Sequence, residues 1–348
     1  MKHVRALGLF GIGIGAAAAV VLGCSSDDTS GTTSGGASRQ PPAPSGAQTT
    51  GTDERTFAVY SLQLGETDRS GATNKDAWKK FGFDLDGLRS TKDSTNVCTQ
   101  VAGAQKSAQE DGDEGIDNAF GKTILPLLPI TGPSKTLNDS IQAEGAFTIM
   151  MRLKGLTDEP AQTNTGLSGT LLIGGSLPTG SRPDFSPSFQ WPYRQDPQIP
   201  ITGAYITNGV FVNGQASAPI ELSLFLSGQA LSLKINKPII TFKHTPPNDL
   251  AEGTIAGVIG TDELIASLEK VAGRISPTLC GGAAFDAIKD TIRKSSDMLK
   301  DGTNRAGAPC DAISVGIGFT AKRIANPTEV FKDDGTTPPD PCKGDGGT

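Results

Sequence analysis

The chain has 348 residues, and its 31 Lys and Arg against 37 Asp and Glu give it a formal net charge of −6. An acidic chain is a poor match for nucleic acid, because a phosphate backbone attracts basic surfaces. The two histidines, His3 and His244, are too few for a zinc site built from several imidazoles.

The N-terminal segment has the composition of an export signal. Two basic residues precede the uncharged run 6–22, which is shorter than the roughly 20 apolar residues of a membrane-spanning helix. The run ends in Val21-Leu22-Gly23-Cys24, which resembles the lipobox of bacterial lipoproteins. The resemblance implies that residues 1–23 are a lipoprotein signal peptide. It also implies that Cys24 becomes the first mature residue and carries a diacylglyceryl thioether and an amide-linked acyl chain. The alternative is an uncleaved anchor helix with an incidental cysteine.

A polar segment follows the predicted lipidation site. Residues 25–54 contain no Val, Ile, Leu, Met, Phe, Trp or Tyr, so they cannot bury a core. Together with Cys24 they predict a disordered tether over 24–54 that reaches roughly 30 Å from a lipid bilayer. Several acyl chains anchor a protein stably. Because Ser25 stands where inner-membrane lipoproteins carry an aspartate, the resemblance implies the outer membrane, on its periplasmic or surface face.

The folded body is predicted to span residues 55–332, which is long enough to bury a sizeable core in one domain or two. Its first strand is predicted at 57–64, and two short helices are predicted at 73–81 and 136–142, the first of which begins with a capping-box sequence. A tail rich in Gly, Pro and Asp follows at 333–348.

Apolar and polar residues alternate through the middle of the body, which is the period of half-buried strands. Residues 220–226 and 231–235 alternate on either side of a short turn and predict a β-hairpin. Further strands are predicted at residues 147–153, 169–173, 204–212, 239–243, 254–259 and 313–321.

Two longer helices are predicted at residues 261–272 and 282–300, each with apolar side chains along one stripe. Strands dominate the middle of the chain, helices lie before and after them, and no regular alternation of strand and helix occurs. The sequence therefore predicts a β-rich α+β fold: an antiparallel sheet or sandwich with a few flanking helices packed on it.

Four cysteines follow Cys24, and an even number in an exported chain predicts two disulfides with three possible connectivities. We favour Cys280–Cys310, because the helix predicted between them and the ten residues after it can return the chain to Cys280. Cys98–Cys342 would then hold the C-terminal tail on the body.

An aromatic loop interrupts the strands. Residues 178–200 carry six prolines together with Phe185, Phe189, Trp191 and Tyr193. One interpretation is an aromatic platform for a ligand such as a glycan, with Trp191 and Tyr193 as binding residues. The other, which we favour because buried aromatic side chains are the commoner case, is that these rings pack down and hold the loop on the body.

One acidic segment has the composition of a cation site. Residues 111–118 read Asp-Gly-Asp-Glu-Gly-Ile-Asp-Asn and resemble a run found in thrombospondin type 3 calcium repeats. The resemblance implies a Ca²⁺ ion held by Asp111, Asp113 and Asp117 and completed by Asn118, because Ca²⁺ takes six to eight oxygens from flexible loops. The alternative is a solvated acidic turn, since the loop lacks the twelfth-position acid of an EF-hand. A second acidic element, residues 83–87, precedes it.

As a whole, the chain resembles the exported lipoproteins of large-genome, myxobacterial-type Gram-negative bacteria. The resemblance lies in residues 21–24, in the tether, and in segments 77–87, 115–118 and 310–319. It implies an extracytoplasmic location and no particular activity.

Two functions remain open. The leading hypothesis is a non-enzymatic, membrane-anchored lipoprotein with a binding or structural role, its partner a glycan or a protein, because no complete catalytic motif is present. The alternative is a secreted hydrolase that uses paired carboxylates on carbohydrate, with the loop 178–200 lining its cleft. The two hypotheses differ in whether two carboxyl groups face one cleft.

Overall fold

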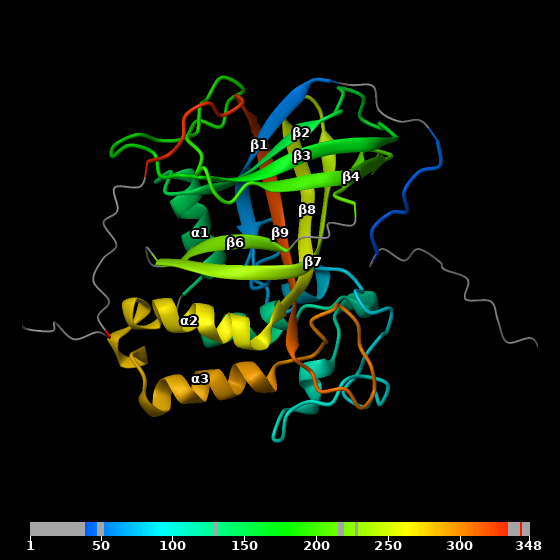
Figure 1. The fold of residues 1–348 in the computed structure, drawn as a ribbon, viewed down its shortest axis with the longest axis vertical. Helices are drawn as coiled ribbons and strands as arrows, with labels where there is room; N and C mark the ends of the chain where they lie inside the picture. The colour runs from blue at the N-terminus through cyan, green and yellow to red at the C-terminus, as the bar shows by residue number, and fades with distance from the viewer. Residues whose placement is uncertain are drawn as a thin grey trace, which may run out of the picture. The chain divides into compact units, whose positions relative to one another are not determined.

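The computed structural model describes residues 39–46, 52–128, 131–214, 219–226, 229–332 and 342. The predicted signal peptide, Cys24 and most of the predicted tether and tail lie outside these residues. The strands (Figure 1) are β1 (Glu54–Gln63), β2 (Thr148–Lys154), β3 (Asn164–Gly174), β4 (Ile199–Thr207), β5 (Val210–Val212), β6 (Ile220–Leu226), β7 (Gln229–Thr245), β8 (Asp249–Gly260) and β9 (Ala312–Ile324). The α-helices are α1 (Pro133–Gln142), α2 (Thr261–Ile275) and α3 (Gly282–Lys294).

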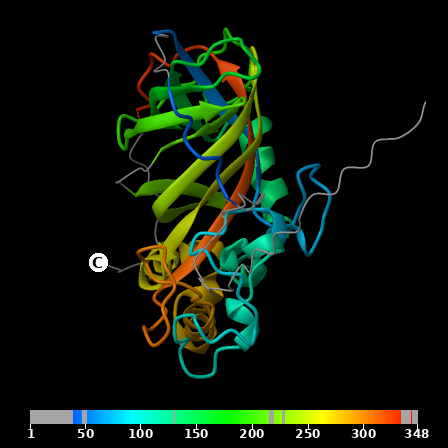
Figure 2. The ribbon, with the colours of Figure 1, turned by 90° about the vertical axis from the view of Figure 1, so that its right-hand side faces the viewer.

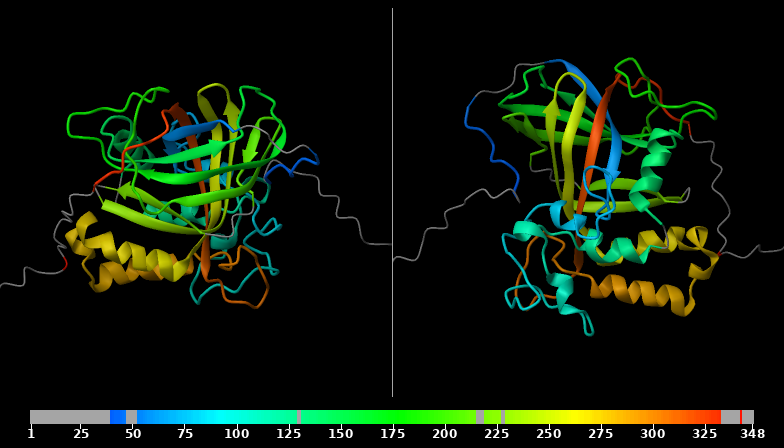
Figure 3. Two further views of the ribbon diagram at one scale, coloured as in Figure 1. Left: turned by 45° about the horizontal axis from the view of Figure 1, so that its top comes forward. Right: turned by 180° about the vertical axis from the view of Figure 1, so that it is seen from behind.

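These strands form one antiparallel sheet that closes on itself. Their order is β5-β4-β3-β2-β1-β9-β8-β7-β6, and β5 also pairs with β7, so eight strands make a ring and β6 extends it (Figure 3). The length of β7 allows this, because its first half pairs with β6 and its second half pairs with β5. The first and last strands, β1 and β9, lie side by side. The predicted β-rich α+β class is confirmed, and the sheet is a closed one.

Large apolar side chains fill the interior of the ring. Phe57, Phe211, Phe242 and Phe319 are fully or almost fully buried, and the rings of Phe211 and Phe242 stack with centroids 4.4 Å apart. The cavity between the interior side chains has a volume of about 10 Å³, which is room for a single water at most. The ring therefore serves as a packed core, in which each buried phenylalanine contributes roughly 1.5–3 kcal/mol.

The buried side chains of the helices join the same core as the interior side chains of the sheet. Helix α1 lies along β1, where the Asn138 side chain both accepts from the Leu62 amide (2.7 Å) and donates to the Leu62 carbonyl (3.0 Å). Helices α2 and α3 lie together at one end of the sheet, beside the loops of residues 65–128 (Figures 1 and 2). Helix α2 buries Leu264, Leu268 and Val271, as its apolar stripe predicts.

Three predicted elements differ from the structure. The helix predicted at 73–81 is a short 3-10 turn, η1 (Ala77–Lys80), because Thr73 instead pairs with Thr67 in a bridge. The strand predicted at 204–212 is the hairpin β4–β5, whose turn residues Asn208 and Gly209 both have positive φ, the geometry of an Asn-Gly turn. Finally, the segment 239–243 belongs to the long strand β7.

The third helix also ends six residues earlier than predicted. Helix α3 stops at Lys294, because the chain then turns back to β9. There the amides of Asp297 and Met298 both donate to the Ala312 carbonyl, at 3.1 and 3.3 Å.

The structure contains two disulfides, but the pairing we favoured is wrong. Cys98 pairs with Cys310, and Cys280 pairs with Cys342, with Cα–Cα distances of 5.2 and 4.8 Å. The physical reason is a backbone pairing: the Thr99 amide donates to Ala308 (2.7 Å) and the Cys310 amide donates to Thr99 (3.0 Å). This pairing places Cys98 beside Cys310.

Candidate metal centre

Two acidic loops meet beside the closed sheet. Backbone hydrogen bonds join the segment 83–90 to the segment 111–117: the Asp117 amide donates to the Phe83 carbonyl (3.0 Å), and the Asp111 amide donates to the Ser90 carbonyl (3.1 Å). These contacts bring carboxylates that are about 30 residues apart in the chain into one cluster.

The cluster consists of Asp84, Asp86 and Asp117. One carboxylate oxygen from each lies within 4.8 Å of the other two. Backbone amides fix their orientation: Leu85 donates to Asp117 Oδ2 (2.7 Å), Gly87 to Asp84 Oδ1 (2.7 Å) and Leu88 to Asp86 Oδ1 (2.8 Å). Since a carboxylate can accept about four hydrogen bonds, these amides leave further lone pairs available.

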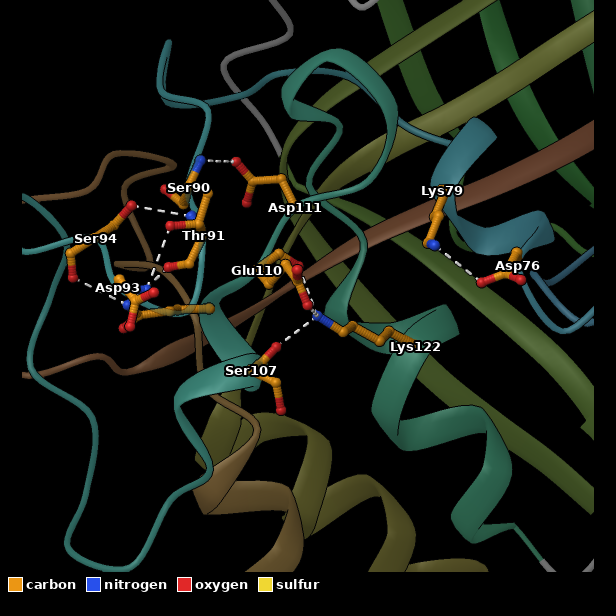
Figure 4. A network of polar contacts seen from close by, with 11 residues as sticks. Asp76, Lys79, Ser90, Thr91, Asp93, Ser94, Ser107, Glu110, Asp111 and Lys122 are labelled. Carbon is orange, nitrogen blue, oxygen red and sulfur yellow. Dashed lines mark hydrogen bonds and ion pairs between the residues drawn. The ribbon is translucent and has the colours of Figure 1, made fainter.

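Two further residues with oxygen-bearing side chains, Ser90 and Asp111, lie on the same two loops. The Ser90 amide donates to Asp111 Oδ2 at 2.5 Å, so both residues border the same loops (Figure 4). Ser90 is 6% exposed, and its hydroxyl oxygen has no hydrogen-bond partner. Asp86 Oδ2 is likewise shut off from solvent and has no partner.

The carboxyl groups resist ionisation in this arrangement. Burial raises the pKa of Asp111 to about 8, and burial also raises the pKa of Asp117 well above its ordinary value. The negative charge of Asp86 adds to both shifts. Nearby, burial raises the pKa of Asp297 to about 7, although the Ser314 hydroxyl and amide donate to its carboxylate. These acids therefore lack enough positive charge around them.

Two basic side chains lie near the cluster, and one of them reaches it. Arg39 donates to Asp84 Oδ2 through Nε (3.1 Å) and Nη2 (3.0 Å). Lys122 instead donates to the carbonyls of Ser107 and Glu110, and Figure 4 shows its ammonium group directed at them. Within the described part of the chain, no ion pair reaches Asp86, Asp111 or Asp117.

The predicted calcium ligands separate into two groups. Asp117 and Asp111 belong to the cluster or its border, whereas Asp113 is exposed on the 3-10 turn η3 (Asp113–Gly115). Both polar atoms of the Asn118 side chain are hydrogen-bonded to the backbone. Its amide nitrogen donates to the carbonyls of Trp78, Phe81 and Gly316, and its Oδ1 accepts from the amides of Gly121 and Gly316.

In this arrangement Asp113 is exposed and the Asn118 side chain is already hydrogen-bonded, and the calcium ion expected at these residues stays a prediction. The motif at residues 111–118 does not include Asp84 and Asp86, which lie beside Asp117 in the structure. The signal that could have found them is the second acidic element, at residues 83–87.

The predicted aromatic residues form no open platform. Trp191 is 0% exposed, its Nε1 donates to the Gly175 carbonyl (2.7 Å), and it packs against Phe185 and Phe189 with ring centroids 5.6 and 5.9 Å apart. Trp191 therefore holds the loop on the body and cannot be a ligand-binding residue in this arrangement. Tyr193 is half-buried, and its backbone pairs with residues 329 and 331.

A groove lies elsewhere on the body, between α1, the loop residues 182–187 and the turn before β8. Its volume is about 850 Å³, and three carboxylates, those of Asp139, Asp184 and Asp249, line it together with the rings of Tyr60 and Phe185. Asp139 is paired with Lys135 and Asp249 with Lys322, at 2.5 and 2.6 Å.

No family model, curated protein or solved structure matches this chain. Among the described residues, every helix is too short or too polar to span a bilayer.

Proposed function

We propose that the chain is an exported lipoprotein, anchored to the outer membrane by acylated Cys24, whose β-rich body has a binding or structural role outside the cytoplasm. The observation that carries this proposal is the pair of disulfides, Cys98–Cys310 and Cys280–Cys342. Disulfides persist in oxidising compartments and are rare in the cytosol. This fits the export signal expected from residues 1–23.

The packed interior of the sheet supports a role at the surface of the body. Among the described side chains, the cavity inside the ring has only about 10 Å³, which is too small for a ligand. A partner would therefore contact the outer faces or the loops of the body.

Replacing Cys24 tests the anchor. In cells that export the full chain, Cys24→Ser should abolish labelling by a radioactive fatty acid, and the precursor should keep its N-terminal segment. The control is Ser25→Ala, which leaves the cysteine in place and should be labelled like the wild type. If Cys24→Ser is labelled and fractionates with the outer membrane like the wild type, the anchoring proposal is wrong.

The second candidate function is a carboxylate-dependent hydrolase acting on carbohydrate. The groove lined by Asp139, Asp184 and Asp249 favours it, because glycoside hydrolysis needs two carboxyl groups facing one cleft. A hydrolase screen and a glycan array on the full chain separate the two functions. Turnover lost in Asp184→Asn supports the hydrolase, whereas binding without turnover supports the leading proposal.

A further inference from the structure

We propose that Asp84, Asp86 and Asp117 bind one calcium ion, with Asp111 and Ser90 supplying further oxygens. This inference goes beyond the anchored lipoprotein, since the ion would bind whether or not Cys24 carries lipid. It replaces the contiguous loop expected from the sequence with ligands from two loops.

The first argument is electrostatic. The three carboxylates converge to within 4.8 Å of one another, at a distance where like charges repel strongly in a partly buried site. Arg39 bonds to Asp84, but no basic side chain of the described residues bonds to Asp86 or Asp117. A divalent cation at their centre supplies the missing positive charge.

The second argument is independent of charge and concerns unused oxygens. The Ser90 hydroxyl, on a residue 6% exposed, and Asp86 Oδ2 are both buried without a hydrogen-bond partner. Buried polar atoms are nearly always paired, so an unpaired one calls for an explanation. Asp86 Oδ2 belongs to a carboxylate of the cluster, so a cation bound there would supply the partner that this oxygen lacks. Ser90 lies four residues further along the same loop, and its hydroxyl is the further oxygen that we assign to the ion.

The chemical type of the ligand atoms indicates which ion would bind. The proposed ligands, Asp84, Asp86, Asp117, Asp111 and Ser90, all offer oxygen, which suits hard cations. Mg²⁺ is usually bound through one or two carboxylates and keeps several waters, whereas Ca²⁺ accepts several carboxylates from flexible loops. Three to four carboxylates on two loops therefore favour Ca²⁺.

The ion would act as a clamp on the loops. Loops 83–90 and 111–117 flank the segment that carries Cys98. They also hold together through backbone hydrogen bonds and through the bonds from the Leu85 and Ser90 amides to the carboxylates of Asp117 and Asp111. Because Ca²⁺ binds the folded arrangement and not the unfolded chain, it should stabilise the fold by mass action.

The test is thermal unfolding of the purified full chain with CaCl₂, with MgCl₂ and with EGTA, together with calorimetric titration of Ca²⁺. At about 100-fold excess over Kd, calcium should raise the melting temperature by roughly 5 °C or more, and EGTA should reverse the shift. Magnesium should raise it less.

Matched variants locate the ion. Asp86→Asn and Asp117→Asn should each weaken Ca²⁺ binding at least tenfold and melt at a higher temperature than the wild type in EGTA, because each removes repulsion. Asp113→Asn removes the same charge from an exposed position of the same acidic segment and should respond to calcium like the wild type.

Three outcomes would overturn the proposal: no calorimetric binding of Ca²⁺ to the wild type, a full calcium response in Asp86→Asn, or loss of the response in Asp113→Asn alone. If Asp117→Asn does not fold, calorimetric titration of the wild type and of Asp86→Asn with Ca²⁺ still tests the proposal.

Discussion

The closed sheet and the loop region between β1 and α1 are stabilised in different ways. In the sheet, neighbouring strands satisfy one another's backbone groups and the interior is filled with aliphatic and aromatic side chains. The described residues 65–128 form short turns without any α-helix or strand, and a disulfide, buried polar side chains and crowded carboxylates hold them. Apolar burial responds to temperature, denaturants and excluded co-solvents, whereas a polar network also depends on bound ions, pH and redox state.

The largest expected effect is in the sheet. Phe319 is fully buried on β9 and contacts the Phe242 ring, so Phe319→Ala should cost about 3–5 kcal/mol of unfolding free energy through lost burial and a cavity. Urea unfolding measures it. The loss of unfolding free energy should be the same in calcium and in EGTA. A loss that changes with calcium would contradict the view that the sheet and the loop region are stabilised differently.

A polar substitution in the loop region should have the next largest effect. Asn118 makes hydrogen bonds to three carbonyls and two amides while 2% exposed. Asn118→Ala leaves those groups buried and unsatisfied, which should cost about 2–4 kcal/mol. Hydrogen exchange should show the amides of Gly121 and Gly316 losing protection. The exposed Asn74 provides the control, since Asn74→Ala should cost well under half as much.

His244 should make the sheet itself sensitive to acid. It is 2% exposed on β7, its two ring nitrogens have no partner, and burial together with Arg55 and Arg323 lowers its pKa to about 4, against a smaller opposing effect of Asp158. The folded state thus binds this proton less readily than the unfolded state does.

The stability contributed by neutral His244 is present above pH 6.5 and is lost as the pH falls toward 4. Relative to His244→Gln, the wild type should lose about 1–2 kcal/mol between pH 7 and pH 5. Urea titrations at both pH values measure this difference. An equal loss in the variant would contradict the role of His244. The loop carboxyls could not be its cause, because their pKa values are raised and they add stability as the pH falls.

The smallest expected effect is at Arg39. Its ion pair with Asp84 is half-exposed and worth about 0.2–1 kcal/mol. Because the guanidinium offsets part of the charge of the cluster, Arg39→Gln should slightly lower stability in EGTA and tighten calcium binding by a few-fold. Calorimetry measures both, and weaker calcium binding in the variant would mean that Arg39 helps to order the site.

The sequence predicted local elements well and their partners poorly. Alternation located β2, the β6–β7 hairpin and β9, because one buried face leaves a period of two in the chain. The Asn208-Gly209 sequence is also typical of a tight turn, and it separates β4 from β5. The sequence pattern does not predict closure of the sheet, because closure depends on pairing between β5 and the C-terminal half of β7.

The candidate site shows the same limit. Asp117 was recognised from its own loop, but its neighbours Asp84 and Asp86 are brought to it by backbone pairing between distant segments. A motif read along the chain assigns ligands to neighbouring residues, here Asp113 and Asn118, whereas the structure groups Asp117 with Asp84 and Asp86. The disulfide pairing failed for the same reason.

The pairing of β1 with β9 sets the order in which the fold can form. Thr56 lies opposite Ile324, so the ring cannot close before the chain has emerged as far as β9. Folds dominated by such distant contacts form slowly. A chain that emerges from its N-terminus also presents Cys98 to Cys280 before Cys310 appears, although Cys98 ends up bound to Cys310. Folding in an oxidising compartment would therefore benefit from disulfide exchange, which corrects an early wrong pair.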